Sequence, residues 1–197
     1  MAQKASVGQV AELVNMCANG TYDAEFVQAL IERRVEKPRE QIYRLHVSYA
    51  KLPGVLALEE KFSGEGSVSI LFDGREWERH SSCISIDATP GERDFRVAEI
   101  PAEFRNHRIK DVWNELAAYF DKKGERFAIE TETVEFADAR PELQRNNRIL
   151  ALGSSALRGV DCRFVTVLRA GDHGRLLDGR RVTDVLYGHS RLLLVRM

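Results

Sequence analysis

The chain has 197 residues, a length that suits one large domain or two small ones. Hydrophobic residues make up 44% of the chain and charged residues 30%, which excludes global disorder because a hydrophobic core can form. The net charge is −1 but is unevenly distributed: residues 147–197 hold nine arginines, four aspartates and no lysine, a charge of +5 that leaves −6 on the rest.

Cysteine usage and the N-terminal sequence indicate the compartment. Cys17, Cys83 and Cys162 are far apart and odd in number, so no disulfide scaffold is expected and a reducing cytoplasm is expected. The first ten residues lack the apolar core of a signal peptide. No apolar run approaches the roughly 18 residues that a membrane span needs, so no membrane partner is expected.

Two amphipathic helices are predicted in the first forty residues. A Ser-x-x-Gln capping pattern begins at Ser6, and apolar residues at helical spacing follow it as far as Cys17. Asp23 is expected to cap a second helix that ends before Pro38. This helix–turn–helix outline invites a DNA-binding interpretation, but the second helix mixes glutamates with arginines and offers no net basic face. Packing of both helices on a sheet is favoured.

Residues 39–52 fit two structures. Ile42, Leu45 and Tyr49 share one helical face, whereas alternate residues from Tyr43 onward share one strand face. The length of the segment and its lack of turn residues favour a helix.

A three-stranded antiparallel meander is predicted in residues 55–100. Apolar and polar residues alternate over residues 68–72, and the Asp-Gly pair that follows is a hairpin-turn signal. The return strand is expected over residues 76–87. A third strand then contains Phe95 and Val97.

The clearest helix lies in residues 102–124, where six apolar residues fall on one face. Asn106 is its expected N-cap, and Gly124 is expected to end it. This helix should cover one face of a sheet. A short strand at residues 127–129 follows, and residues 130–140 fit either a helix or a strand.

Five short apolar runs, separated by Gly, Asp or His-Ser, make up residues 147–197 and predict a small antiparallel sheet. The most apolar run is at residues 192–195. We expect it to be a central or well-covered strand, because docking such a segment is what holds a chain end in place.

A Pro-Glu-Leu-Gln element and an Ala-Leu-Gly-Ser strand occupy residues 141–154, and residues 192–196 form a closing strand that ends in Val-Arg. With these motifs, residues 95–197 resemble the C-terminal part of a family of uncharacterised proteins from small-genome uncultured bacteria. Tyr187-Gly188-His189 stands where that family has a Trp-containing strand. The resemblance implies a helix over residues 132–139 and implies no activity.

The basic C-terminal part predicts an anionic partner, since clustered arginines attract negative charge. The alternative is that the arginines lie on solvated strand faces and stack on their neighbours. The candidate binding residues are Arg175, Arg180, Arg181 and Arg191.

His80 and Cys83 form the most suggestive catalytic cluster, because a cysteine nucleophile needs a base that takes its proton. On a strand these two residues point to opposite faces, so a base from His173 or His189 would be required. The alternative makes Cys83 a small apolar filler and His80 a surface residue.

Trp77 lies between Arg75 and Arg79, and on a strand the three side chains share one face. Such a face suits stacking of bases or sugars. That face is also the less charged one, so a core position for Trp77 is the favoured alternative. Metal-ligand spacings and phosphate-binding glycine motifs are absent from the sequence, so no metal or cofactor is predicted.

The sequence therefore predicts an α+β protein with three regions. These are a helical region at residues 1–54, a meander with a covering helix at 55–124, and an arginine-rich β region at 125–197. The last two regions are alternatively one domain. The predicted function is a non-catalytic cytoplasmic binding protein for a protein or anionic partner. The alternatives are a cysteine-dependent hydrolase or transferase centred on Cys83, and a nucleic-acid-binding protein.

Overall fold

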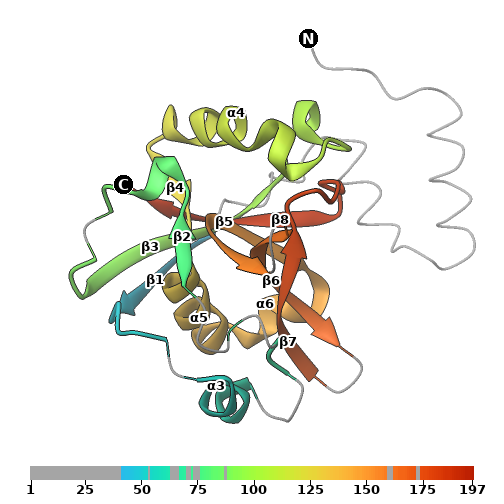
Figure 1. Cartoon of the computed structure of the whole chain (residues 1–197). Coiled ribbons are helices and arrows are strands. Elements are labelled where there is room, and N and C mark those ends of the chain that lie inside the picture. The colour runs from blue at the N-terminus through green and yellow to red at the C-terminus, as the bar shows by residue number, and fades with distance from the viewer. Residues whose placement is uncertain are drawn as a thin grey trace, which may run out of the picture. The chain divides into compact units, whose positions relative to one another are not determined.

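The computed structural model describes residues 41–52, 54–62, 67–69, 72, 76–86, 88–158, 162–171 and 174–197. The chain divides into two compact units, Met1–Gln41 and Ile42–Met197, and the fold below is that of the second unit (Figure 1). The two predicted N-terminal helices fall in residues 1–40 and lie outside the described residues.

One mixed β-sheet organises the second unit, and the predicted α+β class is confirmed. In the described part of the chain, strands run in the order β1-β3-β8-β5-β6-β7, while β2 pairs with β5 and β4 pairs with β8. β5 and β8 are parallel, and the other pairs are antiparallel. The strands are β1 (Ile42–Val47), β2 (Trp77–Arg79), β3 (Gly91–Glu99), β4 (Glu125–Phe127), β5 (Arg148–Arg158), β6 (Cys162–Gly171), β7 (Gly174–Arg181) and β8 (Ser190–Arg196).

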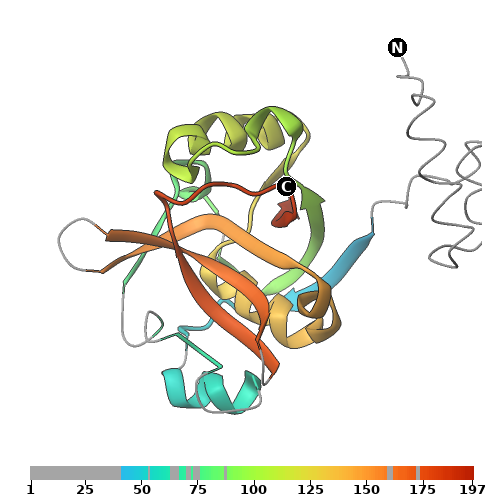
Figure 2. The ribbon, with the colours of Figure 1, turned by 90° about the vertical axis from the view of Figure 1, so that its right-hand side faces the viewer.

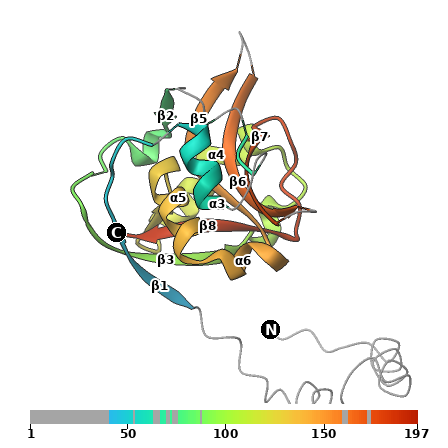
Figure 3. The same cartoon turned by 90° about the horizontal axis from the view of Figure 1, so that it is seen from below.

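Strand β8 lies inside the sheet, between β3 and β5 (Figure 3). Its residues 192–195 are fully buried, which confirms the prediction of a well-covered final strand. Leu193 and Val195 belong to one hydrophobic cluster, and Leu192 and Leu194 belong to the other. Alternate strand residues point to opposite faces. A continuous apolar run therefore fits here because both faces of the sheet are covered.

Helices cover both faces of the sheet (Figure 2). The predicted covering helix is confirmed as α4, which packs its apolar side on the face that carries Leu192 and Leu194. Three shorter helices supply side chains to the core on the opposite face. The helices are α3 (Val55–Phe62), α4 (Ile109–Asp121), α5 (Glu130–Ala139) and α6 (Pro141–Asn146).

The start of α4 differs from the prediction in a way that also changes a predicted strand. Arg108, not Asn106, is the N-cap residue, and it makes no side-chain capping bond. Instead the first two helical N–H groups donate to the carbonyls of Asp184 and Val182, at 3.0 and 2.8 Å. Of the apolar run at residues 181–188, only Arg181 belongs to a strand, as the last residue of β7, and residues 182–188 form turns around the helix start.

The favoured helix at residues 39–52 is wrong, because residues 42–47 form strand β1. β1 pairs with β3, and Tyr43 and Val47 reach the core from one face of it. Pairing with β3 decides between two local patterns that fit the sequence equally well.

The predicted meander is corrected in its strand pairing. The return strand stops at Arg79, and the 3-10 helix η2 (Ser81–Cys83) follows it. The backbone N–H of Ser82 donates to the His80 ring, which stabilises this turn. β2 pairs with β5, whereas Val68 forms an isolated bridge to Leu177. The Asp-Gly pair lies outside the described residues.

Residues 125–146 form a short strand and two helices. β4 occupies Glu125–Phe127, and the helical interpretation of residues 132–139 is confirmed by α5. Gly124 has a φ of +71°, the left-handed conformation expected of a glycine just after a helix.

Gly153 allows β5 to lie directly against the segment that joins β4 to α5. Its N–H donates to the carbonyl of Ala128 at 3.0 Å, beside a shift in register between Ala151 and Ser155. A Cβ at position 153 would lie 2.6 Å from Ala128 O. No side chain fits there, so the glycine is a packing requirement.

Candidate functional site

Cys83 ends η2 and is fully buried, with a relative exposure of 0%. Burial raises the pKa of its thiol, and the hydrogen bond with Ser82 lowers it to a smaller extent. Its Sγ atom donates to the carbonyl of Phe127 at 3.6 Å and lies 3.6 Å from Ser82 Oγ. A buried, protonated thiol is a poor nucleophile. The setting of Cys83 therefore does not favour cysteine-dependent catalysis.

Both ring nitrogens of His80 have hydrogen-bond partners other than Cys83, although one of these partners, Ser82 Oγ, also contacts the Cys83 thiol. Its Nδ1 lies 2.8 Å from Ser82 Oγ, and its Nε2 lies 3.0 Å from Asn114 Oδ1. The ring also stacks on Trp113, with 4.8 Å between ring centroids. Burial lowers the pKa of the imidazole. These contacts join η2 to α4, which is a structural role.

The other candidate histidines are placed elsewhere. His173 lies outside the described residues. His189 stacks on Tyr187, with 5.5 Å between ring centroids. Within the ranges that the structure describes, no three side chains of histidine, cysteine, aspartate or glutamate gather as metal ligands would.

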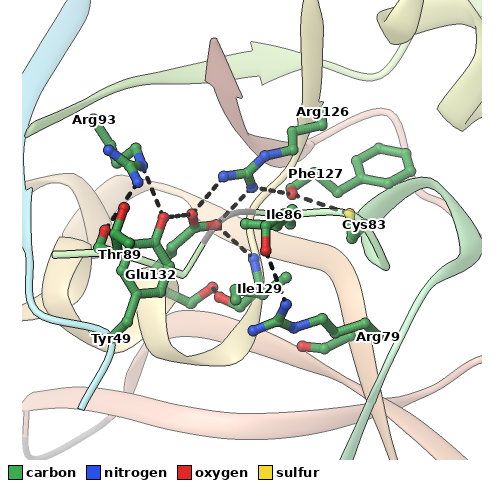
Figure 4. A network of polar contacts seen from close by, with 12 residues as sticks. Tyr49, Arg79, Cys83, Ile86, Thr89, Arg93, Arg126, Phe127, Ile129 and Glu132 are labelled. Atoms are coloured by element: carbon green, nitrogen blue, oxygen red, sulfur yellow. Dashed lines mark hydrogen bonds and ion pairs between the residues drawn. The ribbon is translucent and has the colours of Figure 1, made fainter. Parts of the chain in front are cut away.

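Figure 4 shows the polar network that includes Cys83. Arg126 donates through Nη1 and Nη2 to the two carboxylate oxygens of Glu132, at 2.8 and 2.6 Å. Glu132 also accepts from the Tyr49 hydroxyl at 2.5 Å and from the N–H of Ile129 at 3.0 Å. Each carboxylate oxygen thus has two donors. The network fastens the start of α5 to β4 and to the segment after β1.

Trp77 and Arg79, two of the three residues of the predicted stacking face, both have partners within the chain. Trp77 is half-buried and packs on Phe72, with 5.0 Å between ring centroids. The Arg79 guanidinium donates to the carbonyl of Ile86 at 3.4 Å. Arg75 lies outside the described residues. The position of Trp77 agrees with the core alternative.

Three of the four candidate anion-binding arginines lie outside the pocket described below and have local partners. Arg175 donates to the carbonyls of Ala137 and Lys61. Arg191 lies 3.3 Å from a carboxylate oxygen of Glu99. Arg181 is exposed at the end of β7, where its guanidinium lies over the ring of Phe164. The fourth residue, Arg180, has a different setting.

Arg180 lines a pocket of about 640 Å³ that collects four arginines, and we call it the arginine pocket. Three of the arginines come from adjacent strands, β5, β6 and β7. The fourth, Arg108, precedes α4 and forms a backbone bridge with Val185. The described charged residues that line the pocket are Arg108, Arg148, Arg169, Arg180, Asp178 and Asp184.

The strand register explains why the arginines converge. Ile149 pairs with Leu168, so the flanking residues Arg148 and Arg169 face the same side of the sheet. Val165 pairs with Arg180, which places Arg180 on that side as well. Val165 packs in the cluster that contains the apolar side of α4. The arginines therefore continue the α4-covered face of the sheet beyond its apolar part.

The pocket holds more positive than negative charge. Arg169 donates to Asp178 at 3.0 and 3.3 Å, and Arg180 Nε lies 3.6 Å from Asp184. Arg108 and Arg148 make no ion pair with any described residue. Among the described lining residues, four guanidinium groups and two carboxylates leave an excess of two positive charges.

Arg180 is the buried member of this group, with only 8% of its side chain exposed. Its Nη2 donates to the carbonyl of Val185 at 2.6 Å, and its guanidinium lies over the ring of Tyr187. Its Nη1 is buried without a hydrogen-bond partner. Burial, and next the charge of Arg148, lower the pKa of Arg180. A cation in this setting gains from a nearby anion.

Of the four pocket arginines, only Arg180 was among the candidate binding residues predicted from the sequence. Arg148 and Arg169 stand at the ends of apolar strand runs, where alternation places them on the buried side, and this signal was available. Arg108 had no comparable signal, because it comes from the acidic part of the chain and reaches the pocket only through the fold.

A second pocket, of about 550 Å³, also collects arginines, and three of its four described ones have partners within the chain. Arg44 donates to both carboxylate oxygens of Asp94, at 2.7 and 3.0 Å. Arg93 donates to the Tyr49 hydroxyl, and Arg126 is held by Glu132. Arg44, Arg93 and Arg126 are thus engaged within the chain, whereas Arg196, which also lines this pocket, is exposed and makes no ion pair with a described residue.

Comparisons of the chain with protein-family models, curated proteins and solved structures found no match. None of the described helices is long and apolar enough to cross a membrane. The arginine pocket is therefore interpreted from its own chemistry.

Proposed function

We propose that the protein is a non-catalytic binding protein and that it takes an anionic ligand in the arginine pocket. The observation that carries the proposal is the electrostatic setting of Arg180. A guanidinium that is nine-tenths buried faces a second arginine, and one of its nitrogens has no acceptor. Leaving a buried donor unpaired costs about 1–3 kcal/mol. An anion in the pocket would offset the repulsion between Arg180 and Arg148.

The lining chemistry supports binding more than catalysis. The described lining offers guanidinium, carboxylate and hydroxyl groups, and it includes neither a cysteine nor a histidine. A nucleophile–base pair of the usual kind is therefore not at hand. The free cysteines, Cys83 and Cys162, agree with the cytoplasmic location expected from the sequence.

The alternative of nucleic-acid binding has less support. A nucleic-acid strand needs a continuous track of available positive charge. Outside the arginine pocket, several described arginines already pair with carboxylates, among them Arg44 with Asp94 and Arg163 with Glu78.

Calorimetric titration of the full chain with sulfate, inorganic phosphate and citrate, at constant ionic strength, tests the proposal. We expect at least one of these anions to bind, and Arg148→Gln to weaken that binding at least tenfold. The matched control is Arg181→Gln, on β7 but facing away from the pocket, which should bind as the native chain does. Absence of binding, or an equal loss in the control, would refute the proposal.

A further inference from the structure

We infer that the ligand of the arginine pocket is a small molecule that carries a phosphate-monoester dianion. This inference rests on the proposed function and specifies the class of ligand. Three features of the pocket support it: its net charge, the directions from which its donors come, and its size.

The charge of the pocket matches a dianion. Asp178 is held by Arg169 and by the N–H of Gly179, at 3.0 and 2.7 Å, so one carboxylate neutralises one arginine. Asp184 lies 3.6 Å from Arg180 and is about half exposed. Of the charged groups that the structure describes in the lining, two positive charges remain. A phosphate monoester carries a charge between −1.5 and −2 at neutral pH, whereas a simple carboxylate carries −1.

The donors approach from more than one direction. Arg148 and Arg180 come from the sheet, whereas Arg108 comes from the segment that pairs with Val185 and precedes α4. A phosphoryl group has three terminal oxygens arranged tetrahedrally, and arginine recognises them in pairs. A carboxylate has two oxygens in one plane, so it uses fewer of these donors.

The size of the pocket sets the rest of the ligand. About 640 Å³ is larger than an isolated phosphate needs and lies in the range of small-molecule sites. Thr183, Val185 and Tyr187 line it beside the arginines, which offers a hydroxyl, an aliphatic surface and an aromatic surface to an organic body. A small phosphorylated metabolite fits these features better than a polymer does.

The test measures four probes on the full chain by calorimetric titration at constant ionic strength: O-phosphoserine, sulfate, citrate and a twelve-residue oligothymidylate. We expect O-phosphoserine to bind more tightly than the other three, and Arg148→Gln to weaken its binding at least tenfold. Its affinity should fall as the pH is lowered through the second ionisation of the phosphate, near pH 6. Sulfate stays doubly charged over this range, so its affinity should stay constant.

The variants control for folding. Arg148→Gln should unfold at the same denaturant concentration as the native chain. If it does not, Arg108→Gln, on the opposite wall of the pocket, replaces it as the test variant, and Arg181→Gln remains the control in either case.

The remaining outcomes separate the inference from the proposed function. If sulfate or citrate binds as tightly as O-phosphoserine and depends on Arg148, the phosphate-monoester inference is overturned and anion binding stands. Tighter, Arg148-dependent binding of the oligothymidylate would overturn the inference in favour of a nucleic acid. If no probe binds, both the inference and the proposed function are overturned.

Discussion

Arg126 and Arg180 are buried to the same degree, with 8% of each side chain exposed, but they differ in what surrounds them. Arg126 meets both oxygens of Glu132, whose hydrogen bonds and charge outweigh burial and hold the pKa of Arg126 above its usual value. For Arg180, burial and Arg148 lower the pKa. Arg126 is paired with a carboxylate of the chain, whereas Arg180 keeps one buried nitrogen without a hydrogen-bond partner.

A third buried arginine supports this comparison. Arg96 on β3 donates to both oxygens of Glu125 on β4, at 2.6 and 2.5 Å. Two of the three buried arginines in the described part of the chain therefore have a bidentate carboxylate partner. A buried ion pair with full hydrogen bonding holds a structure in place, whereas an incompletely paired cation is typical of a binding site.

The largest expected effect is at Glu132. Glu132→Gln leaves the buried Arg126 without its counter-charge, so the free energy of unfolding should fall by about 3–5 kcal/mol. Denaturant unfolding followed by circular dichroism measures this. The control is Glu135→Gln on the same helix, whose carboxylate accepts from Ser48 at an exposed position, and it should change stability by about 0.5 kcal/mol or less. A loss under about 1 kcal/mol for Glu132→Gln would remove the distinction between the two arginines.

The next effect is at Gly153, which packs against the segment that carries the Arg126–Glu132 pair. Gly153→Ala places a methyl group against Ala128 O, so stability should fall by about 2 kcal/mol. Gly54→Ala is the matched control, because a Cβ there meets nothing within 4 Å. Equal unfolding midpoints for the two variants would show that the segment yields easily.

A substitution of Arg148 should distinguish the arginine pocket from the Arg126–Glu132 pair most clearly. Arg148→Gln is expected to weaken anion binding at least tenfold and to leave the free energy of unfolding within about 0.5 kcal/mol of the native value. The reason is that Arg148 repels Arg180 and makes no ion pair with a described residue. Parallel calorimetry and denaturant unfolding measure both quantities. A large loss of stability would make Arg148 a structural residue like Arg126.

The smallest effect is a pH dependence at His80. Because burial lowers its pKa in the folded state, the unfolded state binds the proton more tightly. Stability should therefore decrease as the pH falls below about 6.5, the unfolded value, until the folded group is also protonated. His80→Gln should flatten this decrease when unfolding midpoints are compared between pH 7.5 and pH 5. An identical pH profile in the variant would contradict the prediction.

Local sequence patterns were sufficient to predict the elements whose buried residues follow a clear periodicity or a continuous apolar run. The apolar stripe of α4 and the continuous apolar run of β8 each permit one structure, and both predictions are confirmed. β1 is short and satisfies two periodicities, so only its pairing with β3 decides its structure. β2 pairs with β5 across a long stretch of sequence, which a nearby hairpin signal cannot indicate.

The candidate site was predictable in its charge and not in its geometry. The excess of arginine after residue 147 indicated an anionic partner, and Arg180 was among the residues named. Arg175 and Arg191 instead serve backbone carbonyls and Glu99, because each lies next to local acceptors that the fold supplies. The convergence of Arg108 with Arg148 depends on turns around α4. The resemblance to a bacterial family stays a prediction.

The central place of β8 has a consequence for how the sheet assembles. Among the described strands, β1 and β3 are joined to β5, β6 and β7 in the sheet by this strand alone. β8 also pairs residues far apart in sequence, such as Phe95 with Val195. Contacts of such long sequence separation form slowly. Folding of the second unit should therefore proceed as two half-sheets that stay incomplete until their shared middle strand is inserted.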